Sequence, residues 1–168
     1  LQDCQAVVAV LGDLDPAYTA QDWRDLAECH RIDDPLLAQR AYAQAFQRDR
    51  DAGSLRALAF QATANKDYPA SLAAWQTIAD AYTTAFEPLA AADAALAAKA
   101  PARARTWLKD PSHRARLLSD DRYWWLLAQA EADHAPVAAR EALRQALQLR
   151  PDASYYAQLA QWLEADGD

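Results

Sequence analysis

The sequence predicts an all-α chain built from repeated helical hairpins, and three observations support this prediction. The 168 residues include only three glycines and are rich in alanine, so most positions favour a helix and few permit the turns of a sheet. Small residues recur along the chain at a nearly constant interval. Turn-forming stretches, most of them with a proline, fall between the helices that this interval defines.

Each repeat is predicted to be a helix, a turn and a second helix. The second helices carry a small residue followed four positions later by a larger one, at Cys4 and Val8, Ala38 and Tyr42, Ser71 and Trp75, Ala104 and Leu108, and Ala139 and Leu143. These small residues are 34, 33, 33 and 35 positions apart. The first helices carry doublets, at Leu26-Ala27, Leu58-Ala59, Ala91-Ala92, Leu126-Leu127 and Leu159-Ala160. Because two helices approach closely only where the crossing point has little side chain, we expect the small residues to lie at these crossings.

The expected elements follow one another along the chain. The second helix of one repeat spans residues 1–13, four hairpins cover about residues 19–48, 54–82, 87–110 and 121–150, and the first helix of a further repeat spans 153–165. The copy at 87–110 is the weakest, since its first helix is almost pure alanine and its second is cut short at Pro111. Because the chain opens at Leu1, contains no Met and ends in a turn, we expect it to be a piece of a longer protein.

The copy from Tyr123 to Pro151 has the clearest resemblance to a known repeat. Tyr123, Leu126, Ala139, Leu143, Ala146 and Pro151 occupy positions that the tetratricopeptide repeat fills with Trp, Leu, Ala, a large apolar residue, Ala and Pro. Leu127 departs from the pattern, since the repeat usually has Gly there. The chain thus resembles a tetratricopeptide array over essentially its whole length. The resemblance implies a right-handed α-solenoid that forms a single array over residues 1–168, with most of the six tryptophans packed in the core.

Four segments resemble a more particular family. They read "AYTAQDWRDLAECHR", "YAQAFQRDRDAGSLRALAFQA", "KDYPASLAAWQTI" and "DDRYWWLLAQA". In this order and spacing they are similar to the periplasmic repeat region of the NfrA family, outer-membrane proteins named for bacteriophage adsorption. Members of that family are paired with an inner-membrane glycosyltransferase in exopolysaccharide export. The resemblance implies a non-enzymatic periplasmic scaffold whose partners are a protein, such as a glycosyltransferase or phage protein, or a polysaccharide.

Composition and motifs argue against several other functions. The net charge is −7 and only three lysines occur, which disfavours nucleic acid as a partner. The longest apolar run, at 89–98, is alanine-rich and broken by Asp93, so no membrane insertion of this segment is expected. No metal motif, phosphate loop or catalytic motif is present, and no cofactor is expected. We expect the three histidines, His30, His113 and His134, to lie at the surface.

The two cysteines fall on neighbouring helices. Cys4 and Cys29 are equidistant from the turn that joins an antiparallel helix pair, so their thiols are expected within bonding distance. In an oxidising compartment they would form a disulfide, and the periplasmic resemblance favours this outcome. The alternative is two buried free cysteines that act as small apolar residues.

The first helices of tetratricopeptide repeats line a groove, and the repeat register predicts which residues face it. These groove residues are Arg24, Glu28, Arg31, Arg56, Phe60, Trp124 and Glu131. A mixture of aromatic rings and arginines suits a peptide or a glycan. In the alternative reading, Trp124 turns into the neighbouring copy and Arg24 pairs with Glu28 along one helix. The alternative function is that of a cytosolic tetratricopeptide adaptor that binds a peptide segment.

Overall fold

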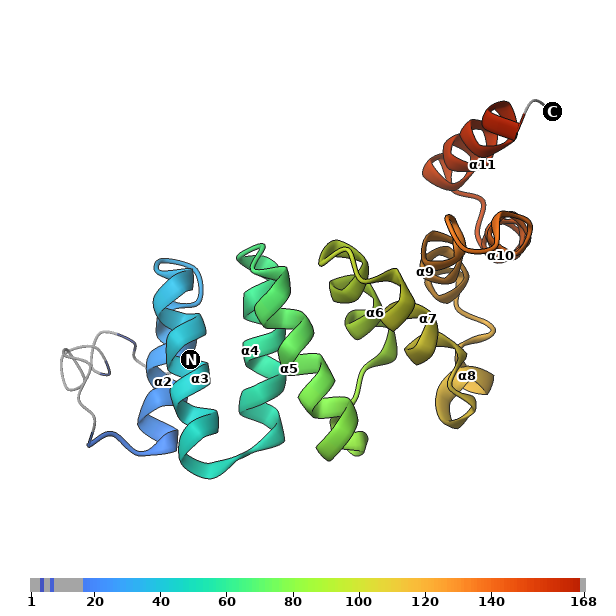
Figure 1. Ribbon diagram of the computed structural model, residues 1–168. Coiled ribbons are helices and arrows are strands. Elements are labelled where there is room, and N and C mark those ends of the chain that lie inside the picture. Colours follow the sequence, from blue (N-terminus) through green and yellow to red (C-terminus); the bar gives the residue numbers. More distant parts are fainter. Residues whose placement is uncertain (1–3, 5–6, 8–16, 167–168) are drawn as a thin grey trace. The chain divides into compact units, whose positions relative to one another are not determined.

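The computed structural model describes residues 4, 7 and 17–166, and Figure 1 shows the helices that they form. Ten α-helices and one short 3₁₀ helix lie within these residues, with no strand among them. The predicted all-α architecture is therefore confirmed. The predicted helix over 1–13 lies outside the described residues, apart from Cys4 and Val7.

The chain divides into two compact units, Leu1–Phe86 and Glu87–Asp168. The first contains α2 (Ala20–His30), α3 (Pro35–Asp49), α4 (Ala52–Ala64), α5 (Tyr68–Ala81) and the 3₁₀ helix η1 (Thr83–Ala85). Helix α2 packs on α3, α3 on α4, and α4 on α5. The first unit thus holds two successive hairpins, as the spacing of its small residues predicted.

The second unit contains α6 (Pro88–Ala97), α7 (Pro101–Lys109), α8 (Pro111–Leu117), α9 (Asp121–Glu131), α10 (Pro136–Leu149) and α11 (Ala153–Asp166). Helix α6 packs on α7, and α9 on α10. Helix α9 also contacts α6 and α7, and α11 packs on α10. A single array over residues 1–168 remains a prediction.

The small residues that the repeat register identified in the described second helices are buried. Ala38, Ser71 and Ala104 are 0% exposed, and Ala139 is 1% exposed. The larger residues four positions later, Tyr42, Trp75, Leu108 and Leu143, are buried as well. Of the six tryptophans in the sequence, Trp23, Trp75 and Trp107 are buried, whereas Trp124, Trp125 and Trp162 are half-buried. The core is therefore built from alternating small and large side chains, as close helix packing requires.

The sequence did not predict helix α8. It predicted only that the preceding helix ends at Pro111. The Asp110 side chain accepts a hydrogen bond from the Ser112 amide at 2.8 Å and caps a new helix, with Pro111 in its first turn. His113 Nε2 contacts the Trp107 carbonyl oxygen at 2.5 Å and fastens α8 to the end of α7. Here the proline both ends one helix and begins the next.

Acidic side chains begin most of the other helices. Asp34, Asp51 and Asp67 each accept a hydrogen bond from a backbone amide in the first turn of the helix that follows. Thr19 and Asp22 form a reciprocal capping box at the start of α2. No helix among residues 17–166 has the length and hydropathy that a membrane crossing requires.

Candidate binding site

The predicted groove residue Arg24 joins three helices of the first unit. Its Nη1 donates to Asp49 Oδ2 at 2.6 Å, at the end of α3, and to Ser54 Oγ at 3.1 Å, on α4. The hydrogen bond from Arg24 holds the pKa of the Asp49 carboxyl below its usual range. Arg24 therefore pairs across helices, and Glu28, its predicted alternative partner, is engaged elsewhere.

Glu28 fastens α2 to α3. Its carboxylate accepts a hydrogen bond from the Tyr42 hydroxyl at 2.5 Å and lies 3.6 Å from the Arg31 guanidinium. Burial raises the pKa of Tyr42, and the bond to Glu28 raises it further. Glu28 and Arg31 thus surround a buried tyrosine hydroxyl.

Phe60 and Arg56 lie on the exposed side of α4. The Phe60 side chain is 44% exposed, and its ring meets the buried Trp75 ring edge to face, with 5.3 Å between centroids. Arg56 is exposed one turn earlier on the same helix. Phe60 keeps an accessible aromatic edge on a rigid base, as a contact residue needs.

Trp124 and Glu131, the predicted groove residues of the second unit, have different surroundings. Trp124 Nε1 donates to the Leu118 carbonyl oxygen at 2.8 Å, which fastens α9 to the chain that follows α8. The Glu131 side chain is 2% exposed and forms an ion pair with Lys109 of α7. Because its carboxylate is buried, Glu131 contributes to the packing of α7 against α9.

An open groove lies in the second unit between α6 and α9, with a volume of about 540 Å³. We call it the α6–α9 groove. Its lining residues are Asp93, Leu96, Ala97, Lys99, Pro101, Trp125, Leu126, Gln129 and Asp133. This volume is in the range of small-molecule sites. None of the seven predicted groove residues lines it.

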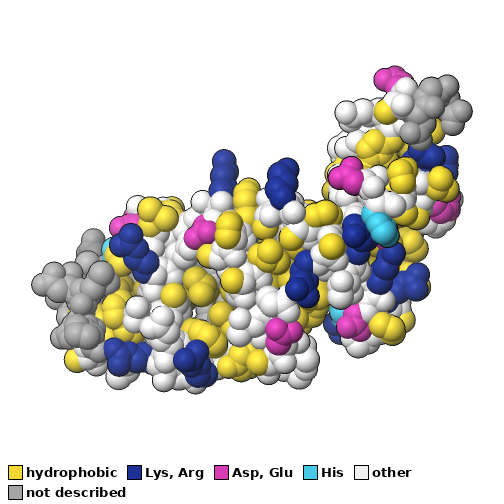
Figure 2. All heavy atoms as spheres, in the orientation of Figure 1, with side chains coloured by type: hydrophobic (Ala, Val, Ile, Leu, Met, Phe, Trp, Pro, Cys, Tyr) yellow, Lys and Arg dark blue, Asp and Glu magenta, His cyan; other side chains and the backbone are white. Residues whose placement is uncertain are grey.

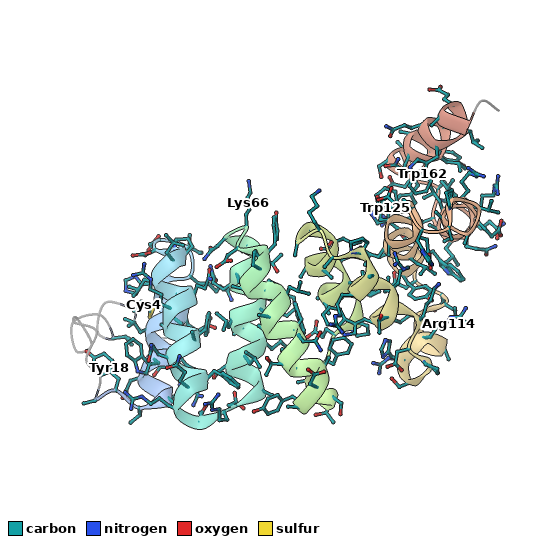
Figure 3. The ribbon with its side chains drawn as sticks, viewed as in Figure 1. Cys4, Tyr18, Lys66, Arg114, Trp125 and Trp162 are labelled. Atoms are coloured by element: carbon teal, nitrogen blue, oxygen red, sulfur yellow. A yellow bond between two sulfur atoms is a disulfide. The ribbon has the colours of Figure 1, made fainter. Side chains whose placement is uncertain are left out.

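Trp125, labelled in Figure 3, is the aromatic side chain of the α6–α9 groove, and it packs on α11. Its ring stacks on Tyr155 of α11, with 4.8 Å between centroids and 19° between planes. The Tyr155 hydroxyl donates to Asp121 at 2.8 Å, and Arg150 Nη2 donates to it at 3.4 Å. Burial raises the pKa of Tyr155, and the hydrogen bond to Asp121 raises it further. The stack fixes one face of the indole.

The polar side chains of the groove differ in their ion pairs, hydrogen bonds and exposure. Asp93 pairs with Arg122 at 3.1 Å. Gln129 Nε2 is buried without a hydrogen-bond partner among the described residues, although buried amides are normally satisfied. Asp133 and Lys99 are exposed at the groove. The groove is therefore lined by an aromatic ring, an exposed carboxylate at Asp133 and a side-chain amide whose nitrogen is buried without a partner among the described residues.

The sequence did not predict this groove, because most of the six tryptophans were expected to pack in the core. Trp125 does pack on Tyr155 of α11, yet it also lines the groove. The available signal was the four-residue spacing of Trp125 and Gln129, which puts both on one side of α9, with Asp133 in the turn that follows the helix.

The Cys4–Cys29 pair forms a disulfide, with 5.3 Å between the two Cα atoms. This separation is typical of a bridged pair. The bond joins the chain before α2 to the last turn of α2. The pairing that the sequence predicted is present in the structure.

The expectation that all three histidines lie at the surface was wrong for His113. Its side chain is 6% exposed and lies between the Ser112 hydroxyl, 3.1 Å from Nδ1, and the Trp107 carbonyl oxygen. His113 belongs to the extra helix α8, which the sequence pattern did not show and which brings its side chain onto the end of α7. Among residues 4, 7 and 17–166, no three His, Cys, Asp or Glu side chains are grouped as metal ligands.

The amino-acid sequence of the chain is similar to that of a known protein. Bacteriophage adsorption protein A of Escherichia coli (strain K12) is 39% identical over 154 residues, which are 92% of this chain. This chain is homologous to bacteriophage adsorption protein A. The chain spans 16% of the length of that protein. The resemblance to the NfrA family is thereby confirmed.

A solved structure supports the fold. MamA 41-end from Desulfovibrio magneticus RS-1, a tetratricopeptide-repeat protein, matches 89% of this chain and 86% of its own chain, with a TM-score of 0.75 and 20% identity. That likeness confirms the tetratricopeptide-like fold. No protein-family model matches the chain.

Proposed function

We propose that this chain is a non-enzymatic periplasmic scaffold, part of an outer-membrane protein related to the phage adsorption protein. In this proposal it binds a protein partner, such as a glycosyltransferase or a phage protein, or a polysaccharide, and so serves exopolysaccharide export and phage adsorption. Homology over 92% of the chain supports the relationship. Because the chain spans only 16% of that relative, the roles of the whole protein belong to the proposal.

The observation that carries the proposal is the α6–α9 groove. Tetratricopeptide-like repeats place rigid helices side by side. A ligand that binds between them therefore does not incur the entropy cost of ordering the protein. The groove adds an aromatic ring, two carboxylates and a lysine to this frame. In the first unit, Arg56 and Phe60 remain proposed contact residues, because both are exposed on α4.

The disulfide supports a periplasmic location. Disulfides persist in oxidising compartments and are rare in the cytosol. Cys4 is exposed, so a reducing compartment would have access to the bond. A thiol count on denatured, unreduced protein checks this directly: we expect no reactive thiol, whereas two per chain would favour the cytosolic adaptor.

Site-specific photocrosslinking tests the scaffold function in cells that make the full-length protein. A photoreactive residue in place of Lys99, in the groove, should give a discrete adduct with a protein or a polysaccharide. The control position is Arg40, an exposed residue of α3, which should give none. If position 99 gives no adduct, or if both positions give the same adducts, the groove is not the binding site.

A further inference from the structure

We propose that the α6–α9 groove binds a neutral sugar unit of a glycan, with a pyranose ring against Trp125 and hydroxyl groups on Gln129 and Asp133. The inference rests on the proposed function, because it names the ligand class of the same groove. Three features of the groove support it, namely a fixed aromatic ring, unused hydrogen-bonding groups and an unfavourable field for anions.

The aromatic ring is fixed before any ligand arrives. Tyr155 covers one face of the Trp125 indole, and Asp121 and Arg150 hold the Tyr155 hydroxyl. A pyranose ring presents a face of C–H groups that packs on the flat surface of an indole. Because the Trp125 side chain is already ordered, little conformational entropy is lost when a sugar packs on it.

The hydrogen-bonding groups match hydroxyls, which both donate and accept. Gln129 lines the groove, and its buried Nε2 lacks an acceptor among the described residues; a rotation of the side-chain amide would turn Nε2 toward a sugar hydroxyl oxygen, which supplies one. Asp133 offers carboxylate oxygens to a hydroxyl proton, and hydrogen bonds to a charged acceptor are the stronger kind. Gln129 lies one helical turn beyond Trp125 on α9, and Asp133 lies in the turn that follows α9, so an oligosaccharide that extends along the groove reaches all three.

The charges at the groove disfavour an anionic ligand. Asp93 and Asp133 carry negative charge there, against one cation on the lining, Lys99. Arg122 is already paired with Asp93 and lies outside the lining. Because Arg122 offsets the charge of Asp93, a uronate or phosphate would meet the negative charge of Asp133 on the lining, which lowers affinity. Neutral sugars avoid this repulsion.

A glycan array that holds both neutral and uronate-containing oligosaccharides tests the ligand class with the purified chain. We expect binding to neutral members and none to their uronate counterparts. Tryptophan fluorescence titration with the best neutral oligosaccharide then measures affinity. No binding on the array, or binding to uronates alone, overturns the proposal.

Two variants with matched controls locate the site. Asp133→Ala removes an exposed carboxylate and should weaken binding of that oligosaccharide by about tenfold or more, since it deletes a charged hydrogen bond. The control Glu164→Ala removes an exposed carboxylate of α11 outside the groove and should leave affinity unchanged. Equal affinity for Asp133→Ala and the unaltered chain overturns the proposal.

Trp125→Leu should abolish binding, and Trp162→Leu, which changes a half-buried tryptophan outside the groove, should not. Circular dichroism checks that both variants remain helical. Different results overturn the proposed scaffold and the proposed ligand class. A protein adduct at position 99 without any sugar binding overturns the ligand class and leaves the scaffold intact, whereas loss of every adduct overturns the scaffold.

Discussion

At the residue scale, several side chains that looked like contact residues hold helices together. Arg24 illustrates this, because it bonds to the end of α3 and the beginning of α4. The side chains of Arg24 and Asp49 are 29% and 34% exposed, so the pair is partly shielded from solvent. Such a pair contributes modestly to stability and more to the alignment of its helices.

A double-mutant cycle on Arg24→Ala and Asp49→Ala should give a coupling energy of about 0.5–1 kcal/mol at pH 7, measured by urea unfolding. Because the folded-state pKa of Asp49 is lowered, this coupling is complete above the ordinary pKa of aspartate, about 3.9, and is lost as the pH falls through the lower folded-state value. The control cycle on Arg144 and Glu141, a solvent-exposed pair within α10, should give only about 0.3 kcal/mol. Equal coupling at pH 7 and pH 2 would contradict the assignment.

At the element scale, the turn between α4 and α5 and the turn between α6 and α7 each contain a lysine in a left-handed conformation. Lys66 has φ 61° and Lys99 has φ 60°. After α4, the Lys66 amide bonds to the Thr63 carbonyl and the Asp67 amide to the Ala62 carbonyl, which is a Schellman ending. Figure 2 shows Lys and Arg side chains projecting from the edge of the molecule, and Figure 3 places Lys66 at the tip of its turn. These positions therefore use lysine where glycine is usual.

Lys66→Gly should stabilise the first unit by roughly 0.5–1 kcal/mol, because glycine adopts positive φ without the steric penalty of a Cβ atom. Chemical unfolding with urea measures the change. Lys66→Ala is the matched control: it removes the same charge and keeps the Cβ atom, so it should give little or no gain. A similar gain from both variants would mean that the charge, not the backbone conformation, limits stability at this turn.

At the scale of the whole molecule, the chain forms two compact units, and the described disulfide lies in the first. Cys4 and Cys29 close a loop across 25 positions. A cross-link of this size stabilises a fold by about 3 kcal/mol in the chain-entropy model. The same bond has no direct effect on the packing of α6 to α11.

Reduction should therefore destabilise the first unit by about 3 kcal/mol and leave the second nearly unchanged. Hydrogen exchange resolved by segment, with and without reductant, measures the two units separately. The variant with both Cys4→Ser and Cys29→Ser is the control, since reductant should have no effect on it. Equal loss of protection in α4 and α10 after reduction would contradict a stabilisation confined to the first unit.

The sequence by itself determined the helices and the way that they pair. Small residues such as Ala38 and Ser71 recur at the repeat period, and caps such as Asp34 and Asp67 precede the helices. These signals are local or periodic, because helix formation depends on neighbours within a few residues and hairpin packing depends on the residue at the crossing. The unexpected helix α8 shows the limit, since Pro111 is compatible with both an end and a beginning.

The tertiary structure alone decided which side chains are used for packing and which line a site. Glu131 and Trp124 share the register of groove residues, yet one is buried against Lys109 and the other donates to the Leu118 carbonyl. The α6–α9 groove joins Asp93 to Asp133, residues far apart in the chain. Their proximity depends on how two first helices pack, a long-range arrangement that the repeat period constrains but does not fix, because each crossing adjusts to the side chains present there.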